Sequence, residues 1–68
     1  MKVTVNGEAM ELPEGVTAAG LLDKLGLNPG LVVVELSLNI LKRDELAKAV
    51  LNEGDQVEIV HFVGGGRG

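Results

Sequence analysis

The six residues from Val63 to Gly68, VGGGRG, are the part of this sequence with the clearest chemical use. Glycine has no Cβ and loses the most conformational freedom when it is ordered, so a glycine run packs no core. The run follows a strand-like segment, residues 56–63 (QVEIVHFV), and this order predicts a flexible arm on a rigid body. Such an arm can enter the active site of another protein, where its carboxylate can be the reacting group.

The remaining residues offer little chemistry of their own. Cysteine is absent and His61 is the single histidine. A histidine without nearby ligands predicts a surface or strand-end residue, not a metal ligand or a catalytic base. The carboxylates are scattered without the spacing of a catalytic pair, and the glycines lack the helix and lysine of a phosphate-binding loop. We therefore expect no metal, no bound cofactor and no enzymatic activity of the chain itself.

Length and charge limit the classes of protein that remain. With 68 residues, the sequence predicts a single domain over residues 1–63 followed by the tail, residues 64–68. The net charge of −4 argues against nucleic acid as a partner, because phosphate binding needs clustered lysine and arginine. The apolar runs are far shorter than the ~20 residues that span a bilayer. The first residues carry no signal-peptide pattern, so we expect a cytoplasmic protein without a membrane segment.

The first third of the chain predicts a hairpin and a helix. Residues 2–6 alternate polar and apolar, Asn6-Gly7 is a strong hairpin turn signal, and residues 8–12 form the return strand with Met10 and Leu12 inward. A helix follows, with Thr17 as its N-cap and Gly26 as its stop. We expect Gly20 to allow close approach of this helix to a sheet. The expected apolar stripe of the helix is Ala18, Leu21, Leu22 and Leu25.

The rest of the chain predicts further strands and a second, short helix. Residues 31–36 read as a central strand, and residues 37–42 suggest a short strand whose pairing the pattern leaves open. Residues 44–51 read as a short helix, and residues 56–63 as the last strand. The sum is an α+β domain, in which one main helix covers one face of a four- to five-stranded sheet.

The C-terminal third resembles a known family. The segment Glu53 to Gly66, EGDQVEIVHFVGGG, joins a turn to a last strand that runs into glycines. With the element order of the whole chain, it resembles the bacterial sulfur carrier proteins, and most closely the ThiS type of the thiamine pathway. The resemblance implies a ubiquitin-like, MoaD-like β-grasp fold: a mixed sheet, one main helix, a short second helix and a flexible glycine tail.

The resemblance also implies a reaction cycle in which the chain is a cosubstrate. A ThiF-like adenylating enzyme uses ATP to activate the terminal glycine carboxylate. Sulfur from a cysteine desulfurase then replaces AMP and leaves a thiocarboxylate, which a ThiG-like thiazole synthase consumes to build the thiazole ring of thiamine. On this view Gly66 is the modified residue (with Gly65 the next choice), and Gly64, Gly65 and Gly66 thread into the partner's site.

Two features near the C-terminus bear on this interpretation. Carriers of this family end on the reactive glycine, whereas Arg67 and Gly68 follow Gly66 here. We favour removal of these two residues by a trimming peptidase; activation of Gly68 itself and a blocking extension are the alternatives. Strand alternation places Val60 and Phe62 on the face of the last strand away from Val57 and Ile59, as a candidate docking pair for the partners.

Two other functions fit the pattern. One is the small carrier subunit of molybdopterin synthase or of another sulfur-transfer route, which differs in the final sulfur acceptor. The other is a ubiquitin-like binding module without covalent chemistry. Removal of residues 64–68 separates these classes, because it abolishes a carrier and leaves a binding module unaffected.

Overall fold

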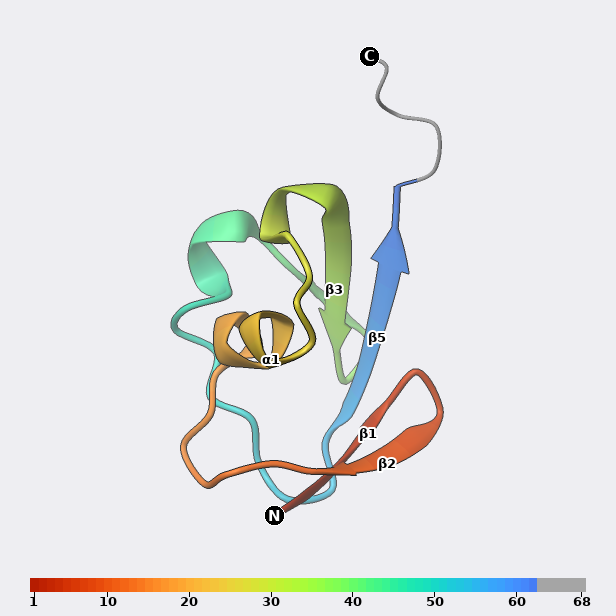
Figure 1. Cartoon of the computed structure of the whole chain (residues 1–68), viewed down its shortest axis with the longest axis vertical. Coiled ribbons are helices and arrows are strands. Elements are labelled where there is room, and N and C mark those ends of the chain that lie inside the picture. The colour runs from red at the N-terminus through yellow and green to blue at the C-terminus, as the bar shows by residue number, and fades with distance from the viewer. Residues whose placement is uncertain (63–68) are drawn as a thin grey trace.

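The computed structural model describes residues 1–62 and shows one mixed sheet with one helix (Figure 1). The sheet has five strands in the order β2-β1-β5-β3-β4. The pairs β1–β2, β3–β4 and β3–β5 are antiparallel, and β1–β5 is parallel. The elements are β1 (Lys2–Val5), β2 (Glu8–Glu11), α1 (Ala18–Lys24), the 3₁₀ turn η1 (Pro29–Leu31), β3 (Val32–Leu36), β4 (Asn39–Leu41), the 3₁₀ turn η2 (Arg43–Glu45) and β5 (Gln56–His61).

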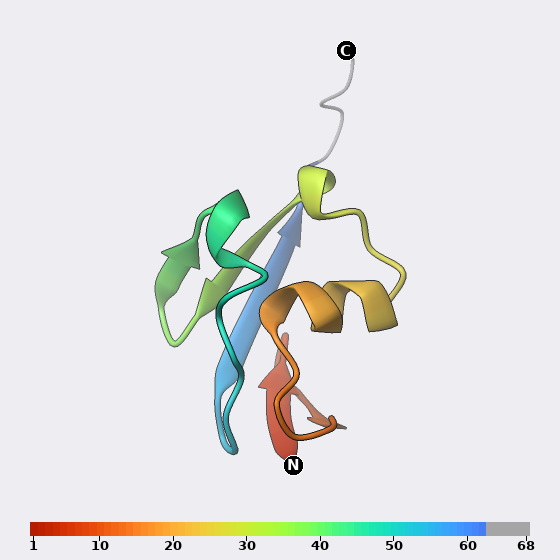
Figure 2. The same cartoon turned by 90° about the vertical axis from the view of Figure 1, so that its left-hand side faces the viewer.

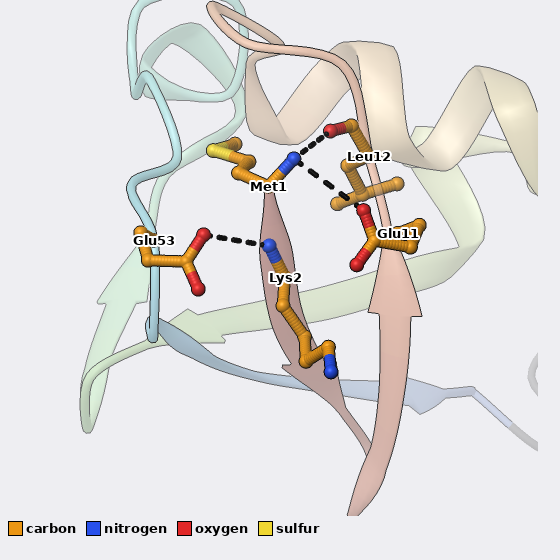
Figure 3. A network of polar contacts seen from close by, with 5 residues as sticks. All are labelled: Met1, Lys2, Glu11, Leu12 and Glu53. Atoms are coloured by element: carbon orange, nitrogen blue, oxygen red, sulfur yellow. Dashed lines mark hydrogen bonds and ion pairs between the residues drawn. The ribbon is translucent and has the colours of Figure 1, made fainter.

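The N-terminal hairpin forms where the sequence predicts it. Asn6 and Gly7 both have positive φ, 50° and 83°, the backbone conformation that a tight hairpin turn requires. At its open end, the N-terminal ammonium donates to the Leu12 carbonyl at 2.8 Å and lies 3.6 Å from the Glu11 carboxylate (Figure 3). These contacts hold the first residue of the chain against the end of β2.

Helix α1 begins and ends at the predicted residues. The Thr17 side chain accepts a hydrogen bond from the Gly20 N–H at 3.1 Å, which confirms it as the N-cap. Gly26 has a φ of +71°, as expected of the residue that stops a helix. The predicted stripe is correct for Ala18, Leu21 and Leu22, which are buried. It is wrong for Leu25, which is the C-cap residue of α1 and is 38% exposed.

The core lies between α1 and one face of the sheet (Figure 2). Leu12 is buried and Met10 is partly buried against this core, as predicted for the return strand. The buried core residues are Val3, Val5, Leu12, Ala18, Leu21, Leu22, Val32, Val34, Leu46, Leu51, Val57 and Ile59. No helix among residues 1–62 is long and apolar enough to cross a membrane.

The predicted short helix over residues 44–51 forms, but its predicted extent is wrong. Only the 3₁₀ turn η2 and the turns after it form there, and Val50 instead makes an isolated bridge with Thr17. The carbonyls of Leu46 and Ala49 accept hydrogen bonds from the first N–H groups of α1, both at 2.9 Å. These carbonyls thereby satisfy N–H groups at the start of α1 that have no partner within the helix. Because they bond to α1, they are not used to continue η2 into a longer helix.

Two further expectations are settled by the tertiary structure. The segment at residues 37–42 does pair, because β4 runs antiparallel to β3 with Ile40 opposite Glu35. The expectation that Gly20 brings α1 close to the sheet is wrong. A Cβ added there would meet the Val16 side chain at 3.0 Å and the Thr17 hydroxyl at 3.5 Å, so the tight neighbour is the chain just before the helix.

Candidate functional site

β5 occupies the middle of the sheet and leads directly to the glycine run. It pairs antiparallel with β3 from Val57 to His61. The Phe62 N–H continues this ladder by donating to the Leu31 carbonyl at 3.0 Å. The sheet therefore holds the chain as far as the last described residue, immediately before the segment to which the sequence assigned chemistry.

The turn before β5 joins its start to β1. The Glu53 carboxylate accepts a hydrogen bond from the Lys2 N–H at 2.8 Å (Figure 3), and the Gly54 N–H donates to the Lys2 carbonyl at 2.8 Å. The Asp55 carbonyl accepts from the Thr4 N–H at 2.9 Å. The φ of Gly54 is +84°, a conformation that favours glycine. The turn Glu53-Gly54-Asp55 thus sets the parallel register of β5 beside β1.

Asn6 supports β5 in a way that sequence reasoning missed. β1 ends at Val5, but the Asn6 N–H donates to the Val57 carbonyl at 2.8 Å. The Asn6 side chain then accepts from the Ile59 N–H at 2.7 Å through Oδ1 and donates to the Ile59 carbonyl at 3.3 Å through Nδ2. The Asn6 side chain therefore makes the two hydrogen bonds to β5 that the backbone of a further residue of β1 would make. The Asn-Gly turn was the only signal at this position, and it predicts the hairpin without this contact.

The two faces of β5 divide as predicted. Val57 and Ile59 are buried toward α1, and His61 is an exposed residue at the strand end. Val60 and Phe62 are 54% and 56% exposed on the other side of the sheet, which we call the open face. Their exposure is confirmed, whereas their role in docking stays a prediction.

The register across the strands shows which residues share the open face. Val33 lies opposite Val60, Glu35 lies opposite Glu58, and Ile40 lies opposite Glu35. Directly opposed residues point to the same side of a sheet. The open face therefore carries apolar side chains on both sides of a pair of glutamates.

The predictions for residues 63–68 lie outside the part of the chain that the structure describes. They include the threading of the glycines, Gly66 as the modified residue and the removal of Arg67 and Gly68. Within residues 1–62, no three histidine, cysteine, aspartate or glutamate side chains are grouped closely enough to hold a metal ion, and no pocket is present. In the described part, two features adjoin the tail: the open face, and the end of β5 at His61 and Phe62, which we call the root of the tail.

Two relatives contain a region similar to this chain within a longer protein. The chain is 43% identical over 67 residues to a thiazole synthase of Magnetococcus marinus, covering 98% of this chain and 21% of that protein. It is 39% identical over 66 residues to a thiazole synthase of Paramagnetospirillum magneticum, covering 97% of this chain and 20% of that protein. The chain thus spans about a fifth of the length of these two relatives.

A solved structure resembles the whole chain. The crystal structure of the thiamine biosynthesis protein ThiS from Geobacter metallireducens superposes with a TM-score of 0.84 at 33% identity, covering 97% of this chain and 100% of that one. This neighbour confirms the expected β-grasp architecture. The ThiS family model matches residues 3–66, from the first inward residue of β1 to the third glycine of the run. The chain therefore belongs to the ThiS family.

Proposed function

We propose that this chain is a sulfur carrier of thiamine biosynthesis that carries its sulfur as a thiocarboxylate on Gly66. The observation that carries the proposal is the family match, which covers all but the first two described residues and ends on Gly66. The thiazole synthases that contain a similar region support a thiazole synthase as the sulfur acceptor.

The proposed chemistry needs an accessible carboxylate and no catalytic group from the carrier. The Gly66 carboxylate attacks the α-phosphorus of ATP in the adenylating partner, and pyrophosphate leaves. The terminal sulfur of a persulfide, formed by a cysteine desulfurase, then displaces AMP. Cleavage of the resulting sulfur–sulfur bond by a thiol leaves the thiocarboxylate. The acyl adenylate is sensitive to water, so it has to form in an enclosed site.

The geometry at the end of β5 suits this task. Phe62 is anchored to β3, so the segment from Val63 to Gly66 spans at most about 14 Å beyond the sheet. A chain without Cβ atoms can pass a narrow channel and present an unhindered carbonyl. Arg67 and Gly68 follow in this sequence, and the proposal requires hydrolysis of the bond between Gly66 and Arg67 before activation.

Val60 and Phe62 complete the proposal as a docking pair beside the tail. Both side chains are more than half exposed at the end of β5 from which the tail continues. A partner that encloses Gly66 has to lie within the reach of a four-residue extended chain from Phe62, about 14 Å. We expect Phe62→Asp to weaken binding to the adenylating enzyme while leaving the urea midpoint of unfolding unchanged. Unchanged affinity would rule out this docking role.

Intact mass spectrometry tests the carrier reaction directly. Three chains, ending at Gly65, Gly66 and Gly68, are incubated with ATP, the adenylating enzyme and the desulfurase of the same organism. With cysteine as the sulfur source and a thiol to cleave the acyl disulfide, we expect the chain ending at Gly66 to exchange one oxygen for sulfur and the shortened chain to react far more slowly. The full sequence should react only with a trimming peptidase present. Modification of untrimmed Gly68 would refute trimming, and the absence of any modification in all three chains would refute the carrier function.

A further inference from the structure

The facing glutamates, Glu35 on β3 and Glu58 on β5, are directly opposed in the sheet register. Their chain neighbours Val34 and Ile59 are buried toward α1, so the two carboxylates lie on the open face. Opposed residues of an antiparallel pair have Cα atoms about 5 Å apart, and like charges in this position destabilise a sheet. The free domain therefore carries an unfavourable charge pair near its centre.

Neither glutamate forms an ion pair with a cation of the described residues. The one ion pair of residues 1–62 joins the N-terminal ammonium to Glu11, at the far end of β2. Solvent screens charges on an exposed face, but it does not make the placement favourable. A partner with a lysine or arginine at this position would convert the repulsion into attraction.

The surroundings of the facing glutamates are apolar. Ile40, opposite Glu35, is 65% exposed, and Val60, two residues after Glu58, lies opposite the half-buried Val33. Phe62 extends this surface to the root of the tail. A partner that fits the face therefore combines an apolar contact area with a basic side chain at its centre.

A second copy of the chain does not meet these requirements. Two copies packed face to face would bring the facing glutamates of both together, and each chain carries a net charge of −4. The relatives favour a thiazole synthase as the partner, because in them a region similar to this chain belongs to the same polypeptide as a thiazole synthase. Covalent linkage raises the effective concentration of such a contact, so a surface of modest affinity suffices.

We infer that the open face is the docking surface for the thiazole synthase, and that Glu35 and Glu58 together bind an arginine or lysine of that enzyme. The inference rests on the proposed function and adds to it a residue pair that selects the partner. The charge pair costs stability in the free carrier and contributes affinity in the complex. Stability and binding are therefore expected to change in opposite directions when it is neutralised.

Calorimetric titration against the thiazole synthase of the same organism tests the pair. We expect E35Q/E58Q to weaken binding by about tenfold or more at low ionic strength, with the difference shrinking as salt is added. The thermal midpoint of the free double variant should rise by roughly 1–5 °C, since a repulsion is removed. E8Q/E14Q, which removes the same two charges from exposed positions in β2 and in the turn after it, is the matched control and should bind as the parent chain does.

The outcomes separate this inference from the proposed function. Thiocarboxylate formation on the parent chain, measured by intact mass, reports on the carrier reaction alone. If the parent chain is thiocarboxylated and binds the synthase, equal binding by E35Q/E58Q and E8Q/E14Q overturns the inference and leaves the carrier function standing. Dimerisation of the free chain through this face, seen by sedimentation and lost in a Phe62→Asp variant, would also overturn it.

Discussion

Asn6 is expected to stabilise the domain far more than a turn residue ordinarily does. In Asn6→Gly, the positive φ of 50° remains accessible, while both side-chain hydrogen bonds to Ile59 are lost. At about 0.5–1.5 kcal/mol for each bond, the free energy of unfolding should fall by about 1–3 kcal/mol. Alanine lacks the local hydrogen bonding that lets asparagine adopt the left-handed region, so the loss in Asn6→Ala should exceed that in Asn6→Gly and reach up to about 5 kcal/mol.

These losses are large against the stability of so short a chain. At about 0.05–0.15 kcal/mol per residue, the whole domain has about 3–10 kcal/mol. Asn6→Ala should therefore leave a marginal fold, and Asn6→Gly is the informative variant. Urea unfolding followed by far-ultraviolet circular dichroism gives the free energies in the order parent, glycine, alanine. Amide exchange should in addition show a selective loss of protection at the Ile59 N–H.

A turn-only role for Asn6 predicts a different result. If Asn6 served the hairpin alone, Asn6→Gly would match the parent chain in stability, and Ile59 protection would stay unchanged. Either finding would refute the argument that the Asn6 side chain extends the β1–β5 ladder. Gly7→Asn controls for effects of the turn itself. It changes the same turn at a position whose positive φ asparagine can also adopt.

Two further predictions concern packing and backbone strain. Leu21→Ala should lower the free energy of unfolding in urea by about 2–5 kcal/mol, because this side chain is fully buried. Leu25→Ala on the same helix should lower it markedly less. Equal losses would place Leu25 in the core. Leu38 has a φ of 73° and is 90% exposed, so Leu38→Gly should raise the unfolding free energy by up to about 1 kcal/mol while Leu38→Ala does not. A loss of stability in the glycine variant would contradict the assigned strain.

Signals that depend on a few adjacent residues predicted the fold correctly. Thr17 caps α1 with its own hydroxyl, Gly26 stops the helix, and Gly7 forms the hairpin turn. The alternation in β5 correctly separated the buried Ile59 from the exposed Val60. Each of these features is governed by backbone preference or by strand geometry, so neighbouring residues suffice to predict it.

The sequence predicted only part of the structure at the root of the tail. Its apolar alternation predicted β5 and the exposure of Phe62, and the glycine run predicted the carrier chemistry that we propose. The support of β5 by Asn6 was not predictable, because it joins residues 53 positions apart through a side chain that local rules assign to a turn.

Long-range contacts decided the remaining elements. Residues 44–51 have the spacing of a longer helix, yet the Leu46 and Ala49 carbonyls bond to the start of α1, and only the 3₁₀ turn η2 forms. Glu35 and Glu58 stand 23 positions apart and become neighbours only through the β3–β5 register. The sequence by itself determined the elements that local preferences dictate, and it suggested the chemistry that we propose for its glycines. The tertiary structure decided which backbone groups and charges meet, because their partners are chosen by the packing of the whole sheet.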